Sequence, residues 1–156
     1  MEDKELRMLG DGALRIETRA VDAGPEREYI TGCAIKFGVR SQNLGGFEEI
    51  IDRDALVDCD LTDVVALINH DNNLILGRTL AGTLTLELRA NDGVYFTIPV
   101  DLEDPDHVRY KRKIEKGEIR GCSFRFSIPD KSDAQVWDFE QMPSLRTVKK
   151  IKKVYE

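Results

Sequence analysis

The sequence is poor in the residues that cross-link small proteins or bind metals. It has three cysteines, Cys33, Cys59 and Cys122, an odd number that includes no C-x-x-C pair. This pattern argues against a disulfide framework and against a cysteine zinc site, and a reducing cytoplasm is the expected compartment. No run approaches 18 apolar residues, so no membrane span is expected. The first ten residues, MEDKELRMLG, lack the apolar stretch of a signal peptide.

Positive charge is also scarce. The chain has 23 Lys and Arg against 29 Asp and Glu, a formal net charge of -6, whereas a protein that binds nucleic acid over its whole surface is usually basic. The exception is Lys149-Lys150-Ile151-Lys152-Lys153, which is interrupted and flanked by the apolar residues Val148, Ile151 and Val154 at every third position. We interpret this run as the solvated face of a half-buried element, with a nucleic-acid patch as the alternative.

The length and the residue patterns predict one domain over residues 1–156, of mainly β structure with some α. Alternating residues predict a hairpin over 84–100 that turns at Asn91-Asp92-Gly93. Asp104-Pro105 predicts the start of a helix that runs to Lys116 and is closed by Gly117. Further strands are expected at 15–21, 29–37, 64–68, 119–128 and 136–139, and a last element of uncertain type at 145–155. Many strands with one clear helix favour a barrel or a sandwich.

Ser123 is the candidate nucleophile. On a strand over 119–128, Cys122, Phe124 and Phe126 share one face, which we expect to be core, and Ser123 and Arg125 share the other. A thiol among phenylalanines stays protonated, so we prefer Ser123 to Cys122. Gly121 permits a close backbone approach, which an oxyanion pocket could use. The alternative is an ordinary solvent-facing serine.

His70 is the candidate general base. It follows the apolar run 64–68 at the mouth of a turn, where catalytic groups are common. The other histidine, His107, falls in the first turn of the predicted helix and is expected to be a solvated surface residue. A metal site built from His70, Asp71, Asp101, Asp104 and His107 is a weaker alternative, because no H-x-x-x-H spacing occurs.

Six stretches in order resemble the tailed-bacteriophage (caudovirus) prohead serine protease family. They are Tyr29-Ile30-Thr31-Gly32-Cys33-Ala34, Phe47-Glu48-Glu49-Ile50-Ile51, Asp63 through Asn69-His70-Asp71, Leu76-Gly77-Arg78-Thr79, Gly121-Cys122-Ser123-Phe124 with Phe126, and Arg146-Thr147-Val148 leading to Tyr155-Glu156. The resemblance covers about residues 29 to 156.

The resemblance implies an endopeptidase with a herpesvirus-assemblin-like fold, a closed or partly closed β-barrel with a few flanking helices. It implies that Ser123 is the nucleophile and His70 the base, with no cofactor. Such a phage-encoded protease acts in the host cytoplasm, inside the prohead, on scaffold and major capsid protein and on itself. We expect a homo-oligomer, no membrane and no nucleic-acid partner.

The resemblance also identifies further site candidates and two departures from the family pattern. Glu156 aligns with a plausible third triad member, with Asp138 and Glu140 in reserve. Arg78 could assist an oxyanion site, but pairing with a carboxylate is the favoured interpretation. Arg125 replaces the usual glycine of the motif and adds bulk and positive charge to the proposed active face, so we expect it to bear on substrate preference or on catalytic competence. The family's final strand and tail, which follow Glu156, are expected to be missing, so a catalytically inactive capsid assembly or scaffold module on the same fold is the alternative function.

Overall fold

The computed structural model describes residues 3–9, 14–22 and 24–156, which form twelve strands and one helix. The expectations for the first ten residues and for a domain over 1–156 therefore lie partly outside the described residues. The strands are β1 Glu5–Leu9, β2 Arg15–Arg19, β3 Arg27–Lys36, β4 Phe47–Ile51, β5 Val65–Ile68, β6 Asp71–Arg78, β7 Thr85–Arg89, β8 Gly93–Pro99, β9 Cys122–Ser127, β10 Gln135–Asp138, β11 Ser144–Val148 and β12 Lys153–Val154.

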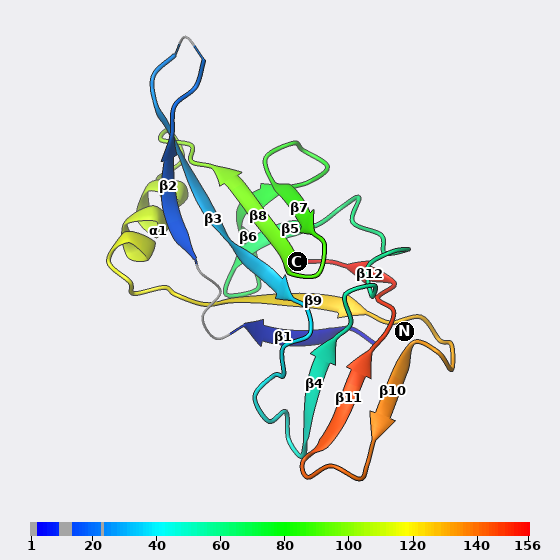
Figure 1. Cartoon of the computed structure of the whole chain (residues 1–156). Coiled ribbons are helices and arrows are strands. Elements are labelled where there is room, and N and C mark those ends of the chain that lie inside the picture. The colour runs from blue at the N-terminus through cyan, green and yellow to red at the C-terminus, as the bar shows by residue number, and fades with distance from the viewer. Residues whose placement is uncertain (1–2, 10–13, 23) are drawn as a thin grey trace.

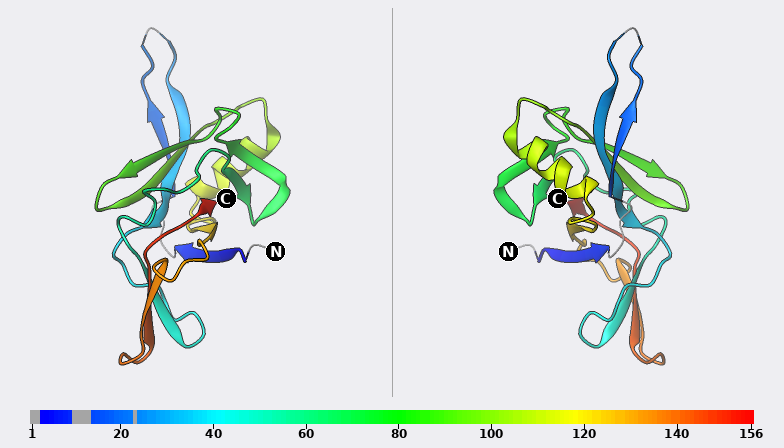
Figure 2. Two further views of the ribbon diagram at one scale, coloured as in Figure 1. Left: turned by 90° about the vertical axis from the view of Figure 1, so that its right-hand side faces the viewer. Right: turned by 90° about the vertical axis from the view of Figure 1, so that its left-hand side faces the viewer.

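The described strands form four sheets with the orders β2-β3-β8-β7, β1-β9-β12, β10-β11-β4 and β5-β6. The β2–β3 pair and the β4-β11-β10 sheet project at opposite ends of the molecule (Figure 2), and β1 and β9 run between them (Figure 1). The mainly-β prediction is confirmed, but no closed ring of strands is found in the described part, and one helix stands where a few were predicted. Most strands have five residues or fewer, which limits how far each can pair around a ring.

The helix α1, Pro105–Glu115, is close to its predicted bounds. The Asp104 side chain accepts a hydrogen bond from the Asp106 N–H at 2.8 Å, as expected of an N-cap. Gly117 ends the helix with a φ of +70°, a left-handed backbone conformation that glycine adopts without strain. The prediction for His107 is wrong: it is buried, because it shares the inward face of the helix with Tyr110 and Ile114.

The predicted hairpin is confirmed as β7 and β8, joined at residues 90–92. β8 ends at Pro99, as the proline predicts. In β3 the register with β8 shifts between Cys33 and Ile35, as at a β-bulge.

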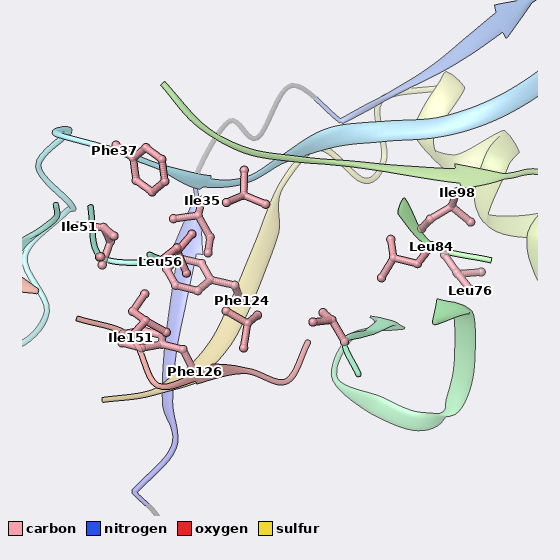
Figure 3. Close-up of a cluster of buried hydrophobic side chains, with 14 of the residues drawn as sticks. Ile35, Phe37, Ile51, Leu56, Leu76, Leu84, Ile98, Phe124, Phe126 and Ile151 are labelled. Atoms are coloured by element: carbon pink, nitrogen blue, oxygen red, sulfur yellow. The ribbon is translucent and has the colours of Figure 1, made fainter. Parts of the chain in front are cut away.

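The hydrophobic core packs against one face of β9. Phe124 and Phe126 are 4% and 0% exposed, and Figure 3 shows them among Ile35, Leu56 and Ile151. Their burial fixes which face of β9 turns inward. Ser123 and Arg125 must then lie on the opposite face.

The C-terminal segment joins β9 to the β5–β6 hairpin. β12 runs antiparallel to β9, with Val154 opposite Phe126. On its other side, the Val65 N–H of β5 donates to the Tyr155 carbonyl at 3.0 Å. Two segments that are far apart in the sequence, around residues 70 and 123, are therefore held to one common strand.

The lysine run over residues 149–153 forms the solvent-facing side of this half-buried C-terminal segment. Lys149 pairs with Asp52 at 2.5 Å and Lys153 with Asp60 at 2.9 Å, and Lys150 also pairs with Asp133. Ile151 is buried between them. The interpretation as a solvated face over core residues is confirmed. The one helix of the described chain is too short and too polar to cross a membrane.

Candidate active site

His70 occupies the tip of a tight hairpin. Ile68 and Asp71 pair across the end of β5 and β6, which leaves Asn69 and His70 as a two-residue turn. Both have left-handed backbone, with φ of 51° and 59°, as a type I′ turn requires. Asparagine and histidine tolerate this region better than most residues, although it costs about 1 kcal/mol each relative to glycine. The turn places the imidazole at the end of the hairpin rather than along a strand face.

Ser123 meets this imidazole from β9. The distance from Ser123 Oγ to His70 Nε2 is 2.7 Å, within normal hydrogen-bond range. Both residues are half-buried, so the contact is partly screened from water and still open to a substrate. Two side chains 53 residues apart are thus in direct contact, with the geometry that a nucleophile and its base need.

Glu156 lies on the far side of the ring. Its Oε1 is 3.3 Å from His70 Nδ1 and 2.8 Å from Arg125 Nε, and its side chain is only 6% exposed. Neither contact has the angles of a regular hydrogen bond, and both carboxylate oxygens are buried. The carboxylate is therefore shared between an imidazole and a guanidinium.

A β-bulge turns Glu156 toward this site. Tyr155 donates its N–H to the Arg125 carbonyl and Glu156 accepts from the Arg125 N–H, both at 2.8 Å, so two residues oppose one. Regular alternation from the buried Val154 would send the Glu156 side chain to the core face. The extra residue brings it instead to the face of Arg125 and Ser123, which is a common use of bulges near active sites.

The other candidate carboxylates are engaged elsewhere. Asp71 Oδ1 accepts from the Asn73 N–H at 2.9 Å. Asp138 accepts from the Glu140 N–H at 3.0 Å, in the β10–β11 turn. Glu156 is thus the candidate acid that contacts His70.

Arg78 does not join this group. Its guanidinium donates to both oxygens of Asp63, at 2.6 and 2.7 Å. Arg78 therefore pairs with a carboxylate, which is the interpretation that the sequence favoured. It ends the eight-residue strand β6, whose other end carries the His70 turn, roughly 20 Å away. An oxyanion role for Arg78 therefore has no support in this geometry. Gly121 lies exposed, directly before β9.

Cys122 is on the core side of β9, where its Sγ donates to the Cys33 carbonyl at 2.8 Å. Burial raises the pKa of the Cys122 thiol to about 12, so at pH 8 only about one molecule in 10,000 carries the thiolate. We expect alkylation by iodoacetamide to accelerate with pH up to about 12, without the levelling near pH 9 of an ordinary thiol. Peptide mapping by mass spectrometry measures this. Rapid modification of Cys122 below pH 8, with loss of peptidase activity, would contradict the assignment.

His107 belongs to the helix packing and not to the site. Its Nδ1 accepts from the Asp101 N–H at 3.2 Å. Within the described residues, no cluster of three or more His, Cys, Asp or Glu side chains could hold a metal ion.

The sequence comparisons are consistent with this geometry. Residues 14–156 match the family model of the caudovirus prohead serine protease, which covers nearly the whole chain. No curated protein and no solved structure matches the chain significantly. On the strength of the family match, we conclude that the chain belongs to the caudovirus prohead serine protease family.

Proposed function

We propose that this chain is a serine endopeptidase in which Ser123 is the nucleophile, His70 the general base and Glu156 the group that orients the base. The observation that carries the proposal is the 2.7 Å contact between Ser123 Oγ and His70 Nε2. The family match supports a serine peptidase, and the contact supports our proposal that Ser123 and His70 carry these roles.

In the proposed reaction, Ser123 Oγ attacks the carbonyl carbon of the scissile peptide bond while His70 Nε2 accepts the hydroxyl proton. His70 then returns this proton to the amide nitrogen, the C–N bond breaks, and an acyl-serine forms. Water, deprotonated by His70, attacks the ester and releases the carboxylic acid and free Ser123. Through both steps Glu156 stabilises the imidazolium from the Nδ1 side.

Backbone N–H groups of β9 are the proposed oxyanion donors. The Arg125 N–H and carbonyl bond to Tyr155 and Glu156. Alternation along the strand turns those of Ser123 to the same edge, away from β1. The Ser123 N–H thus faces the side on which a substrate carbonyl would lie. Gly121, two residues earlier, adds an N–H on this edge without a side chain.

We propose the phage scaffold and major capsid proteins as substrates, cleaved inside the prohead in the host cytoplasm, with self-processing by an oligomer of this chain. The support is the family match alone. A relationship to herpesvirus assemblin stays a prediction.

The test is to incubate the protein with the scaffold and major capsid proteins of the same phage. Wild type should yield discrete fragments by mass spectrometry, and Ser123→Ala should yield none, while Ser132→Ala, a change at an exposed loop serine, should match wild type. Equal cleavage by wild type and Ser123→Ala would refute the proposal. Intact substrates with a folded wild-type protein would favour the inactive assembly module.

Glu156→Gln should lower kcat about a hundredfold or more. The amide keeps the shape but cannot stabilise the imidazolium, and it can bind the ring in the wrong tautomer. Steady-state cleavage of a fluorogenic peptide measures the loss. Glu140→Gln, a change at an exposed reserve candidate, is the matched control and should be neutral. Equal kcat for both variants would exclude Glu156 from the mechanism.

A further inference from the structure

Strand β1 has an inverted polarity. Its charged residues Glu5 and Arg7 point inward and are largely buried, whereas Leu6 and Met8 are 43% and 66% exposed. A half-buried strand normally places its apolar residues inward. Two large aliphatic side chains on an open face therefore call for a use other than core packing.

This exposed apolar face lies beside the candidate nucleophile. In the β1–β9 pairing, Met8 is directly opposite Ser123 and Leu6 opposite Arg125. The Arg125 main chain is bonded to Tyr155 and Glu156, so these are the non-hydrogen-bonded pairs of the ladder. Side chains at such pairs are closest, with Cβ atoms about 5 Å apart. Met8 and Ser123 are thus neighbours on one surface.

Buried ion pairs prevent β1 from turning over. Arg7 Nε donates to Glu49 Oε1 at 2.7 Å and Arg146 Nη2 to Glu5 Oε1 at 2.8 Å. The Glu49 and Arg146 side chains are only 2% and 5% exposed. Turning the strand over by a one-residue slip would expose these partners and bury Leu6 and Met8, so the apolar face is locked outward.

We propose that Met8 and Leu6 form a substrate subsite that takes a large aliphatic side chain flanking the scissile bond. The inference rests on the proposed function and adds its specificity. The subsite lies before residue 14, where the family match begins, so it belongs to this chain and not to the matched region. When the scissile carbonyl lies at the edge of β9 away from β1, a flanking side chain that extends across β9 reaches Met8, and an aliphatic group there displaces water from both apolar surfaces.

The test is a fluorogenic peptide series based on one cleaved scaffold site, with leucine, serine or glutamate at each position within three residues of the scissile bond. For wild type, kcat/KM should be about ten- to a hundredfold higher for leucine than for serine at one position. Met8→Ser should remove most of this preference. Met8→Lys should shift the preference at that position from leucine to glutamate. Met142→Ser, a change at a methionine that is 93% exposed in the β10–β11 turn, is the matched control and should keep the wild-type profile.

The outcomes separate the two proposals. Cleavage by wild type with no aliphatic preference, or with a preference that Met8→Ser and Met8→Lys leave unchanged, overturns the subsite and leaves the peptidase intact. No cleavage of any peptide or scaffold substrate overturns both. Since Met8 is exposed, circular dichroism of the variants should match wild type, and a shift in preference at constant fold is the result that supports the subsite.

Discussion

Ser123→Ala and His70→Ala should each lower kcat for peptide cleavage by about 10⁴-fold or more, and the double variant should be no worse than either single one. Nucleophile and base act as a unit, so removing the second costs nothing once the first is gone. The 2.7 Å contact between Oγ and Nε2 is the physical basis. Single-turnover assays on one fluorogenic peptide measure all four proteins.

His107→Gln is a useful control for this cycle. His107 is buried in the helix face, where its Nδ1 accepts from the Asp101 N–H and its Nε2 lies 3.9 Å from Asp104 Oδ2, so its loss should affect stability more than kcat. Multiplicative losses in the Ser123 and His70 double variant would mean that the two residues act independently, and the proposed dyad would have to be abandoned.

Glu49→Ala should destabilise the protein by about 3–5 kcal/mol, because it breaks a buried ion network. Glu49 Oε1 accepts from Arg7, and Oε2 accepts from Arg7 at 2.9 Å and from Arg146 at 2.8 Å. Without Glu49, two largely buried guanidinium groups share the single carboxylate of Glu5 within this network. The network ties β1, β4 and β11 together, so β1 should detach first. Urea unfolding monitored by circular dichroism gives the free energy of unfolding.

The neighbouring Glu48→Ala is the matched control. Glu48 pairs with the half-exposed Arg40 at 3.0 Å, and such surface pairs contribute about 1 kcal/mol or less. A Glu49→Ala loss as small as that of Glu48→Ala would contradict the network's role.

The same ion network determines the direction in which the stability of the protein changes with pH. Burial alone would raise the pKa of Glu5, but hydrogen bonds and charges from Arg146 and Arg7 outweigh it and lower that pKa. A lowered pKa contributes stability that is present above the ordinary range of glutamate and is lost as the pH falls through the folded-state value. The effect of Glu5→Gln on stability should accordingly shrink in acid.

Local patterns predicted much of the site. Alternation along 119–128 assigned Phe124 and Phe126 to the core and Ser123 to the other face, as found. It also assigned Cys122 to the buried, unreactive side, where burial raises the pKa of the thiol. The turn composition after residue 68 placed His70 in a loop, and the turn is a tight two-residue hairpin. These features depend on residues close together in the sequence.

Long-range geometry was beyond the sequence pattern. β1 was not predicted, because its inward residues are charged and are stabilised by partners more than 40 residues away. β6 begins with Asp71-Asn72-Asn73, a turn composition, and pairing with β5 overrides it. The orientation of Glu156 depends on a bulge opposite Arg125, which only the paired strands reveal. The family resemblance, rather than any periodicity, identified Glu156 as a candidate.

Arg125 shows how the departure from the family pattern is accommodated. Its guanidinium contacts the Glu156 carboxylate at 2.8 Å, closer than the imidazole at 3.3 Å. The added cation thus compensates a buried carboxylate that would otherwise have the imidazole as its near neighbour. Its charge is directed toward Glu156, so we expect it to fix the carboxylate's position.

The central claim is that His70 activates Ser123, and covalent labelling tests it most directly. A fluorophosphonate probe should add once to the folded wild type, and peptide mass spectrometry should locate the adduct on Ser123. His70→Ala should abolish labelling under the same conditions, while His107→Gln should keep it. Labelling on another serine, no labelling of the wild type, or equal labelling of His70→Ala would contradict the account.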